Sequence, residues 1–223
     1  LILGGGSGQL IAIKKAKEKG HTVIVSDYYE NAPGKKYADY GETVSTFDIK
    51  GNIKVGRKYD IDGVMTIGTD QPVYTAARVA ENLNLPFPFS LSTAKAVTNK
   101  RNMKKNFKKY SIPTVNFKIL EKDFSLSELD NFNFPVVIKP LDSQGQRGVF
   151  KLNSHEKVKE KFNEVLKFSR EEEILLEEYY ESKEITVSGW VNNDNLKILT
   201  VTDRITYETS LHIGICTAHI FPS

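Results

Sequence analysis

A strand that leads into a glycine-rich turn lies past the middle of the chain and constrains its fold most. Val136, Val137 and Ile138 form a short apolar run that ends at Lys139 and Pro140, and a polar segment with two glycines follows. Glycine lets backbone N–H groups turn toward an anion, and a lysine beside such a turn adds positive charge. The pattern predicts a phosphate-binding strand and loop. Its alternative is a surface hairpin with a lysine at the edge.

Composition narrows the class of protein. The 223 residues are 39% hydrophobic and 26% charged, which supports a genuine core in one large domain or two smaller ones. A net charge of +3 suits anionic small ligands and falls short of a nucleic-acid-binding signature. The single cysteine, Cys216, excludes an internal disulfide framework. No apolar run reaches the ~18 residues of a membrane span. One cysteine permits a reducing cytosol, so we expect a cytoplasmic protein, with neither a membrane nor a nucleic acid among its partners.

The first ninety residues alternate between strand and helix patterns. Strands are predicted at residues 1–3, 22–25 and 63–67, with a short candidate at 43–44, and helices are predicted after Gln9, Asp48 and Asp70. Strands separated by helices predict a parallel sheet covered on both faces. Ligands of such sheets bind beyond the carboxyl ends of the strands, so residues 4–9 and 68–71 are expected at the ligand edge.

The glycine turn after the first strand resembles a dinucleotide site only in part. The fingerprint G-x-G-x-x-G is broken, because Gln9 stands at the last position when counted from Gly4, and Ile11 when counted from Gly6. We therefore favour a turn that packs the helix on the strand or binds another ligand. Asp27, at the end of the second strand, keeps an NAD-dependent oxidoreductase as an alternative.

From Ser92 the pattern changes to lysine-rich helices and then to strands. Asn99 is predicted to cap a helix whose inward stripe includes Met103 and Phe107. The lysines at 104–109 favour a solvated face, whereas Lys100 opposes the helix dipole in the first turn and is expected to need a nearby anion. Further strands are predicted at 116–120, 148–152, 174–180, 184–191, 197–201 and 211–221, and helices after Ser125 and Ser154.

Four motifs in this order resemble the ATP-grasp superfamily, which contains biotin carboxylase, carboxyaminoimidazole ribonucleotide synthetase and the carbamoyl-phosphate synthase large subunit. They are Leu-Gly-Gly-Gly-Ser-Gly-Gln-Leu, Asn99-Lys100 followed by Ile112-Pro113, Phe-Pro-Val-Val-Ile-Lys-Pro, and Ile-Leu-Leu-Glu-Glu-Tyr-Tyr followed by Lys-Glu-Ile-Thr-Val-Ser. The resemblance covers nearly the whole chain. It implies an α/β protein that is α+β in its second half: a parallel-sheet pre-ATP-grasp domain at 1–91, a small ATP-grasp lobe with a glycine-rich lid at 92–182, and an incomplete large lobe at 183–223.

The resemblance also implies ATP-binding roles for single residues. Lys100 and Lys139 would hold the phosphates, and the loop with Ser143, Gly145, Arg147 and Gly148 would close over the terminal phosphate. The backbone of Glu178 and Tyr180 and the side chain of Glu177 would read adenine, and Glu184 would accept hydrogen bonds from the ribose. The alternative for Glu177 and Glu178 is a pair of solvated carboxylates at a strand end. Strand alternation places Glu184 on one face with Thr186 and Ser188.

The implied activity is that of an ATP-dependent carboxylate–amine or carboxylate–thiol ligase, resembling carbamoyl-phosphate synthase. A carboxylate, or bicarbonate, would attack the terminal phosphate to give an acyl phosphate, which an amine or other nucleophile would capture. Mg²⁺ would neutralise the phosphates. After Glu184 the only acids are Asp194, Asp203 and Glu208, without the family's Glu-x-Asn, so we expect a chain that starts inside its natural protein and ends before the metal ligands. Arg204 is a candidate for contact with phosphate or with the acyl substrate. An ATP-binding regulatory module without turnover remains the alternative, and a homodimer is compatible with either.

The last strand carries three side chains that could coordinate or react. Strand alternation places His212 and Cys216 on one face and His219 on the other, so they form one cluster only if a bulge intervenes. Two histidines and one cysteine also fall short of a closed zinc site. We expect Cys216 to be a small buried apolar residue rather than a nucleophile, because the sequence places no base beside it.

Overall fold

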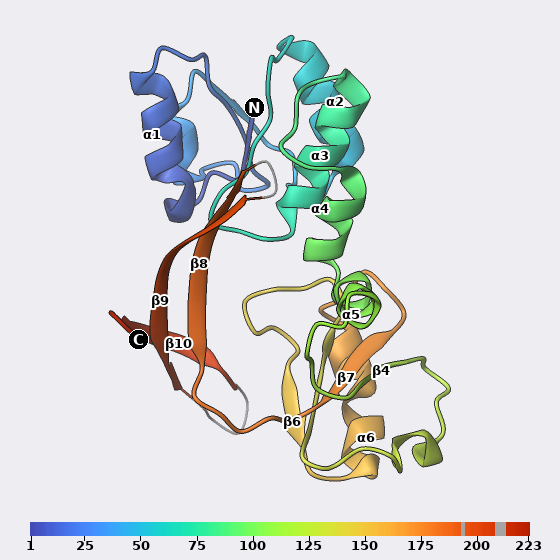
Figure 1. Ribbon diagram of the computed structural model, residues 1–223. Coiled ribbons are helices and arrows are strands. Elements are labelled where there is room, and N and C mark those ends of the chain that lie inside the picture. The colour runs from blue at the N-terminus through green and yellow to red at the C-terminus, as the bar shows by residue number, and fades with distance from the viewer. Residues whose placement is uncertain (193–194, 208–212) are drawn as a thin grey trace. The chain divides into compact units, whose positions relative to one another are not determined.

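The chain forms two compact units, residues Leu1–Tyr110 and Ser111–Ser223 (Figure 1). The computed structural model describes residues 1–192, 195–207 and 213–223. Each unit has its own apolar core, the first around Leu3 and Val79 and the second around Ile138 and Leu176. Within the described residues, no helix is both long and apolar enough to cross a bilayer.

The first unit is a parallel sheet with helices on both faces. Its strands are β1 (Ile2–Leu3), β2 (Ile24–Ser26) and β3 (Tyr40–Glu42), in the order β1-β2-β3. Its helices are α1 (Leu10–Glu18), α2 (Ile49–Lys58), α3 (Pro72–Leu83), α4 (Leu91–Thr98) and α5 (Lys100–Lys109), with 3₁₀ turns η1 (Ser7–Gln9) and η2 (Pro33–Tyr37). Successive strand residues face opposite ways: Ile24 packs with Val55 and Val79, and Val25 packs with Ile13. The predicted α/β layer is confirmed.

Two of the predicted strands differ from the structure. The strand predicted at 63–67 is reduced to one parallel bridge between Met65 and Ile2, because the extended segment is short and is bounded by left-handed Asp60 (φ 45°) and Gly68 (φ 68°). The short strand predicted at 43–44 lies earlier, as β3, and Val44 instead accepts a hydrogen bond from Ser26. The Met65 segment still hydrogen-bonds to β1, through the Leu3 N–H and the Leu1 carbonyl.

Helix α2 is continuous through its two glycines, Gly51 and Gly56. Asp48 caps it by accepting a 2.9 Å hydrogen bond from the backbone N–H of Gly51. Gly56 faces α3, and a Cβ at that position would lie 2.5 Å from a methyl carbon of Leu83. The glycine therefore allows α2 and α3 to approach closely, which offsets its low helix propensity.

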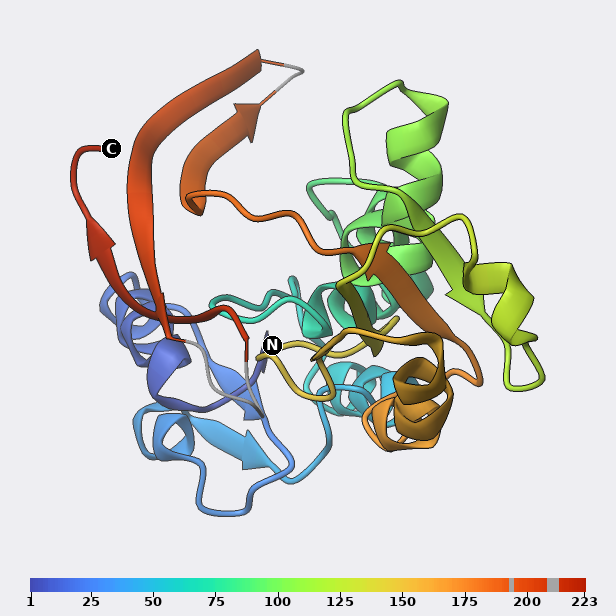
Figure 2. The same ribbon diagram turned by 90° about the horizontal axis from the view of Figure 1, so that it is seen from below.

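The second unit begins with a four-stranded antiparallel sheet. Its strands are β4 (Phe117–Leu120), β5 (Val136–Pro140), β6 (Phe150–Leu152) and β7 (Ile174–Glu178), in the order β4-β7-β5-β6. The 3₁₀ turn η3 (Leu126–Leu129) starts with a capping box of Ser125 and Glu128. Ser154 caps α6 (His155–Leu166), which packs Val158, Phe162 and Val165 on one face of the sheet. Figure 2 shows α6 lying against this sheet from a second direction.

A second antiparallel sheet follows, made of β8 (Ile185–Asn192), β9 (Asn195–Tyr207) and β10 (Ile215–Ile220) in the order β10-β9-β8. The register between β8 and β9 shifts after Ser188, where Leu199 is the extra residue, and the register between β9 and β10 shifts at Thr217. A bulge of this kind moves every later side chain to the other face of the strand. The bulge at Thr217 therefore changes which residues of β10 share a face.

The units meet at residue 110, later than the limit at 91 suggested by the sequence. Helix α4 packs on α3, and α5 packs on α4, so residues 92–110 belong with the first unit. The division of the remaining chain into a lobe ending at 182 and a second lobe from 183 stays a prediction.

Candidate functional site

The face of the four-stranded sheet opposite α6 carries a paired lysine and glutamate. Val136 and Ile138 point to the core with Leu176, so Lys139 and Glu177, one residue out of phase, point to the other face. The Lys139 Nζ forms an ion pair with a Glu177 carboxylate oxygen. Their side chains are 24% and 8% exposed, so a largely buried acid is neutralised by a partly accessible cation. Strand alternation thus explains how the apolar run presents one lysine away from the core.

The glycine-rich segment predicted from the sequence connects β5 to β6 as a loop. Gly145 and Gly148 both have positive φ, 68° and 67°, as does Gln146 at 58°. Gly148 is confined by Phe168, which would lie 2.8 Å from an added Cβ, whereas an added Cβ at Gly145 would meet open space. The loop therefore combines one packed glycine with one that is open on its Cβ side. Ser143 and Arg147 lie in the same loop.

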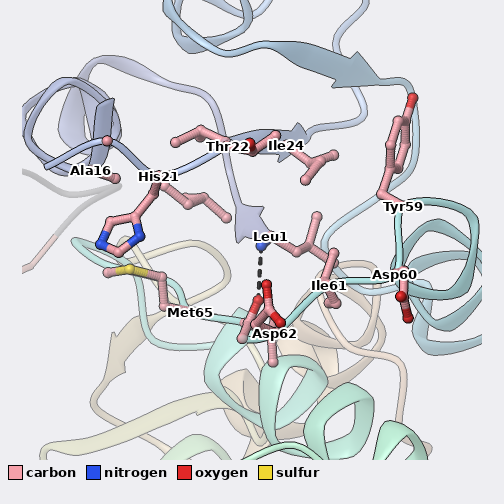
Figure 3. Close-up of a pocket in the computed structure, with 15 residues that line it drawn as sticks. Leu1, Ala16, His21, Thr22, Ile24, Tyr59, Asp60, Ile61, Asp62 and Met65 are labelled. Atoms are coloured by element: carbon pink, nitrogen blue, oxygen red, sulfur yellow. Dashed lines mark hydrogen bonds between the residues drawn. The ribbon is translucent and has the colours of Figure 1, made fainter. Parts of the chain in front are cut away.

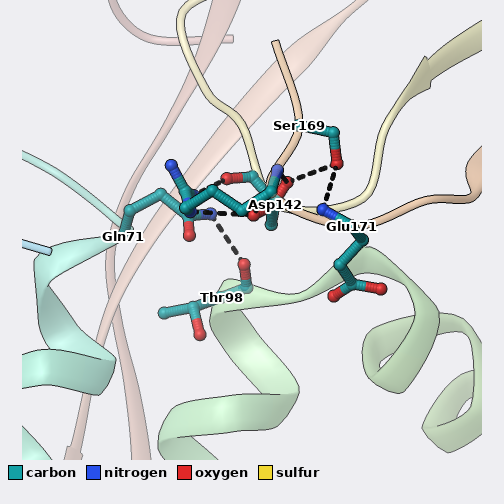
Figure 4. Close-up of polar contacts among 6 residues, drawn as sticks. Gln71, Thr98, Asp142, Ser169 and Glu171 are labelled. Atoms are coloured by element: carbon teal, nitrogen blue, oxygen red, sulfur yellow. Dashed lines mark hydrogen bonds and ion pairs between the residues drawn. The ribbon is translucent and has the colours of Figure 1, made fainter. Parts of the chain in front are cut away.

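Asp142, the residue before this loop, was missed by the sequence analysis. Its side chain is 11% exposed and accepts a 2.8 Å hydrogen bond from the Ser169 hydroxyl (Figure 4). The Arg170 Nε lies 2.9 Å from the other carboxylate oxygen. Its partners lie 27 and 28 residues away, at no regular spacing, so only a tertiary structure could reveal them.

The end of β7 shows what Glu178 and Tyr180 contact. The Glu178 N–H donates to the Asn116 carbonyl at 3.1 Å, and its carboxylate accepts from the backbone N–H of Asn133 at 2.9 Å. Tyr180 is 74% exposed. The Glu178 N–H is therefore used inside the sheet. The adenine-reading roles of Glu177, Glu178 and Tyr180 stay predictions.

Glu184 lies just before β8 and is paired with Arg204. The Arg204 Nη1 is 3.1 Å from a Glu184 carboxylate oxygen, and the Arg204 N–H donates to the Glu184 carbonyl at 2.8 Å. The Gly214 carbonyl accepts from the second Arg204 guanidinium nitrogen and from the Gln146 side-chain amide, each at 3.4 Å. Within the second unit, Gln146 of the glycine loop and Arg204, the partner of Glu184, thus donate to the same carbonyl oxygen.

The tail cluster corrects one expectation. Because of the bulge at Thr217, Cys216 and His219 share a face, and the Cys216 Sγ lies 3.4 Å from the His219 Nε2. The His219 Nδ1 is 2.9 Å from the buried Thr202 hydroxyl. Cys216 is partly exposed rather than buried, so both the predicted separation and the predicted burial are wrong. His212, Asp194 and Glu208 lie outside the described residues.

Lys100 is the first residue of α5, in the first unit. Asn99 caps this helix as predicted, accepting the Asn102 N–H at 3.2 Å. The Gln71 side-chain amide donates to the Thr98 carbonyl at 2.7 Å, which fixes the turn just before Lys100 (Figure 4). Lys100 and Lys139 belong to different units, so their convergence on one ligand stays a prediction.

Asp27 holds the first glycine turn in place. Its two carboxylate oxygens accept the backbone N–H groups of Gly5 and Tyr29 at 2.8 and 2.9 Å. The carboxylate is thus engaged by the protein, which gives the dinucleotide alternative no support. A hollow of about 330 Å³ adjoins Gly6 and Asp27 at the predicted ligand edge.

A larger cavity of about 610 Å³ lies at the other edge of this sheet (Figure 3). It is lined by Leu1, Thr22 and Asp62, among others, and the Leu1 amino group donates to the Gly63 carbonyl at 2.8 Å. Because ligands of parallel sheets bind at the carboxyl ends of the strands, this cavity takes no part in the candidate site.

The chain is similar in sequence and in fold to several known proteins. A family profile described as the D-ala D-ala ligase C-terminus matches residues 107–213. Carbamoyl-phosphate synthase of Methanobrevibacter smithii is 30% identical over 134 residues, 57% of this chain and 35% of that protein. N5-carboxyaminoimidazole synthetase from Staphylococcus aureus, solved in complex with ADP, has a TM-score of 0.72 at 18% identity, covering 95% of this chain and 55% of that one. The chain belongs to the ATP-grasp superfamily.

This ATP-grasp chain spans about half the length of the curated relatives it matches. The formate-dependent phosphoribosylglycinamide formyltransferase of Prochlorococcus marinus is 28% identical over 186 residues, which cover 80% of this chain and 47% of that enzyme. The matched family profile lies almost wholly in the second unit, where Lys139, Glu177 and the glycine loop are found. The ATP-grasp resemblance stated from the motifs is confirmed.

Magnesium is the metal that the ATP-grasp family implies. Among the residues that the structure describes, no three His, Cys, Asp or Glu side chains come together to hold a metal ion. The cations and glycines of the second unit fit an anion instead.

Proposed function

We propose that these residues hold the nucleotide of an ATP-dependent carboxylate–amine or carboxylate–thiol ligase. The observation that carries the proposal is the Lys139–Glu177 pair on the sheet face opposite α6, reached by the strand that leads into the glycine loop. A triphosphate carries several negative charges, and a partly exposed lysine beside backbone N–H groups is a fitting partner for it.

Six of the predicted residues take a role in this proposal. Lys139 binds a phosphate oxygen when its ammonium turns from Glu177, and Glu177 then accepts a hydrogen bond from the adenine amino group. Glu184, oriented by Arg204, accepts the ribose hydroxyls. Lys100 adds a second cation from the first unit, and Gly145 and Gly148 let the loop backbone approach the terminal phosphate.

The chemistry that follows is attack of a carboxylate oxygen on the terminal phosphorus of ATP, which breaks the bond to the β-phosphate and releases ADP. An amine or a thiol then attacks the acyl carbon, loses its proton and releases inorganic phosphate. Positioning and charge stabilisation account for most of the catalysis of phosphoryl transfer, and the proposed site offers both. Magnesium carried by the nucleotide would supply a counter-charge to the phosphates. Substrates like those of carbamoyl-phosphate synthase are supported by the Methanobrevibacter relative, which is 30% identical over 134 residues. The single cysteine supports a cytoplasmic location.

Titration of the 223-residue chain with MgATP and with NADH, followed by calorimetry, tests the proposal. We expect micromolar to millimolar affinity for ATP and no binding of NADH. Binding of NADH without ATP would instead favour the oxidoreductase. Incubating the full-length protein with MgATP and a panel of carboxylates and amines, and measuring ADP release, separates a ligase from a regulatory module. A protein that binds ATP and releases no ADP with any pair would be the module.

A further inference from the structure

Both ends of the glycine loop are attached to one short segment, residues 168–171, which precedes β7. At the first end, Asp142 accepts hydrogen bonds from the Ser169 hydroxyl at 2.8 Å and from the Arg170 N–H at 3.2 Å. The Arg170 Nε completes the set at 2.9 Å, and the Arg170 guanidinium also donates to the Asp142 carbonyl. The largely buried carboxylate is thereby satisfied by backbone, hydroxyl and cation together.

The second end of the loop meets the same segment by packing. Gly148 lies so close to Phe168 that an added Cβ would be 2.8 Å from the ring and 3.2 Å from the Phe168 Cβ. The Ser169 hydroxyl also accepts the Glu171 N–H at 3.0 Å, which holds the segment in its turn (Figure 4). The five residues 143–147 therefore span between two fixed points on one support.

This support is continuous with the strand that bears Glu177. Segment 168–171 leads directly into β7, and β7 pairs along its whole length with β5, the strand that bears Lys139. The base of the loop is thus held at a fixed position relative to Lys139 and Glu177 of the candidate site. Tethering of this kind limits where the loop backbone can lie relative to the Lys139 ammonium.

We propose that Asp142 is a positioning residue: through Ser169 and Arg170 it fixes the base of the loop that receives the terminal phosphates of a nucleoside triphosphate. The proposal rests on the proposed function for its ligand. Asp142 itself touches no phosphate, and its carboxylate acts by keeping the backbone N–H groups of residues 143–148 within reach of Lys139.

Digestion with trypsin measures how firmly the loop is held, because trypsin cleaves after Arg147, which lies within residues 143–147. Cleavage after Arg147 is followed by mass spectrometry in the 223-residue chain, relative to cleavage after Lys118 in the same sheet. We expect Asp142→Asn to raise this ratio about tenfold without nucleotide, the effect of losing one hydrogen bond to a charged group. Glu164→Gln, which breaks an exposed ion pair with Lys161, is the matched control and should leave the ratio unchanged.

The same digestion with MgATP present shows whether Asp142 positions the loop for the nucleotide or only stabilises the fold. MgATP should protect Arg147 in the wild-type chain, and Asp142→Asn should raise the ATP concentration for half-protection about tenfold. A parallel rise of cleavage at Lys118 and Arg147, with unchanged ATP dependence, would show a merely structural role and overturn the proposal. If the wild type fails to bind ATP, the proposed function fails, while the nucleotide-free ratio still tests the anchor. Ser169→Ala gives the same test, expected in the same direction, should Asp142→Asn not fold.

Discussion

Lys139 shows how one side chain can serve both folding and binding. Its ammonium neutralises Glu177, which is 8% exposed, so removal of the lysine takes this counter-charge away from a carboxylate in a low-dielectric setting. The same ammonium is 24% exposed and can exchange this partner for a phosphate. A binding variant at this position must therefore be controlled for stability.

We predict that Lys139→Met weakens MgATP binding by about 1.5 to 3 kcal/mol, the scale of a hydrogen bond to a charged group. Lys118→Met is the matched control. Lys118 lies in the same sheet and pairs with Glu128, but the pair is exposed, and its loss should leave ATP affinity unchanged. The double variant Lys139→Met/Glu177→Gln should regain much of the stability of the fold without regaining affinity. Calorimetry and thermal unfolding separate the two effects, and a folded Lys139→Met chain with full affinity would remove the lysine from the site.

Gly145 and Gly148 provide a matched pair with nearly the same φ. We expect Gly145→Ala to cost about 1 kcal/mol of stability, since only the left-handed conformation opposes it. Gly148→Ala should cost about 1 to 3 kcal/mol more, because its Cβ would also clash with Phe168. Urea unfolding measures both, and equal losses would mean that Phe168 moves aside freely.

The role of a residue could be predicted from the sequence only where its partners lie close to it along the chain. Lys139, Asn99 and Ser154 follow from local strand and helix patterns, and their placement in strand or cap is confirmed. Asp142 and Thr202 act through partners 17 to 28 residues away, so no local pattern marks them. The pairing of Cys216 with His219 depends on a bulge, which strict alternation cannot foresee.

At the scale of elements, the sheet of β8, β9 and β10 has two unlike faces. One carries Glu184, Arg204, Thr202 and His219. The other carries Ile185, Val187, Ile205 and Ile220, which are 45–53% exposed. Such a concentration of apolar side chains is unusual on the surface of a monomer. The sequence predicted the strands but not how much apolar surface they leave uncovered, because burial depends on what packs against them.

We therefore predict that the 223-residue polypeptide binds the dye ANS and self-associates as its concentration rises. Val187→Thr together with Ile205→Thr should reduce both effects, since threonine keeps strand propensity while removing apolar surface. Thr186→Ser, on the opposite face, is the control. Dye fluorescence and analytical ultracentrifugation provide the measurements, and a monomer without dye binding at high concentration would contradict the prediction.

At the scale of the whole molecule, the chain is two units with separate cores. The parallel sheet of the first unit and the α/β to α+β change along the chain could be predicted, because periodicity and the four motifs are local. The boundary between the units could not be predicted, because α4 and α5 belong to the first unit through their packing on α3 and on each other, which composition does not reveal.

Hydrogen exchange can locate this limit. Leu3→Ala should cost about 2 to 5 kcal/mol and reduce protection in the first unit, whereas Ile138→Ala should do so in the second. The decisive peptide covers residues 100–110. We expect its protection to fall with Leu3→Ala and to persist with Ile138→Ala, and the reverse would assign α5 to the second unit.

The shared support of the glycine loop has a consequence for how such a chain can change. Because β5, β6 and β7 are held together without the five residues from 143 to 147, those residues can be replaced or lengthened like an exchangeable cassette. Sequence variation at residues 143–147 would then change which ligand the loop binds and leave the sheet of β5, β6 and β7 intact.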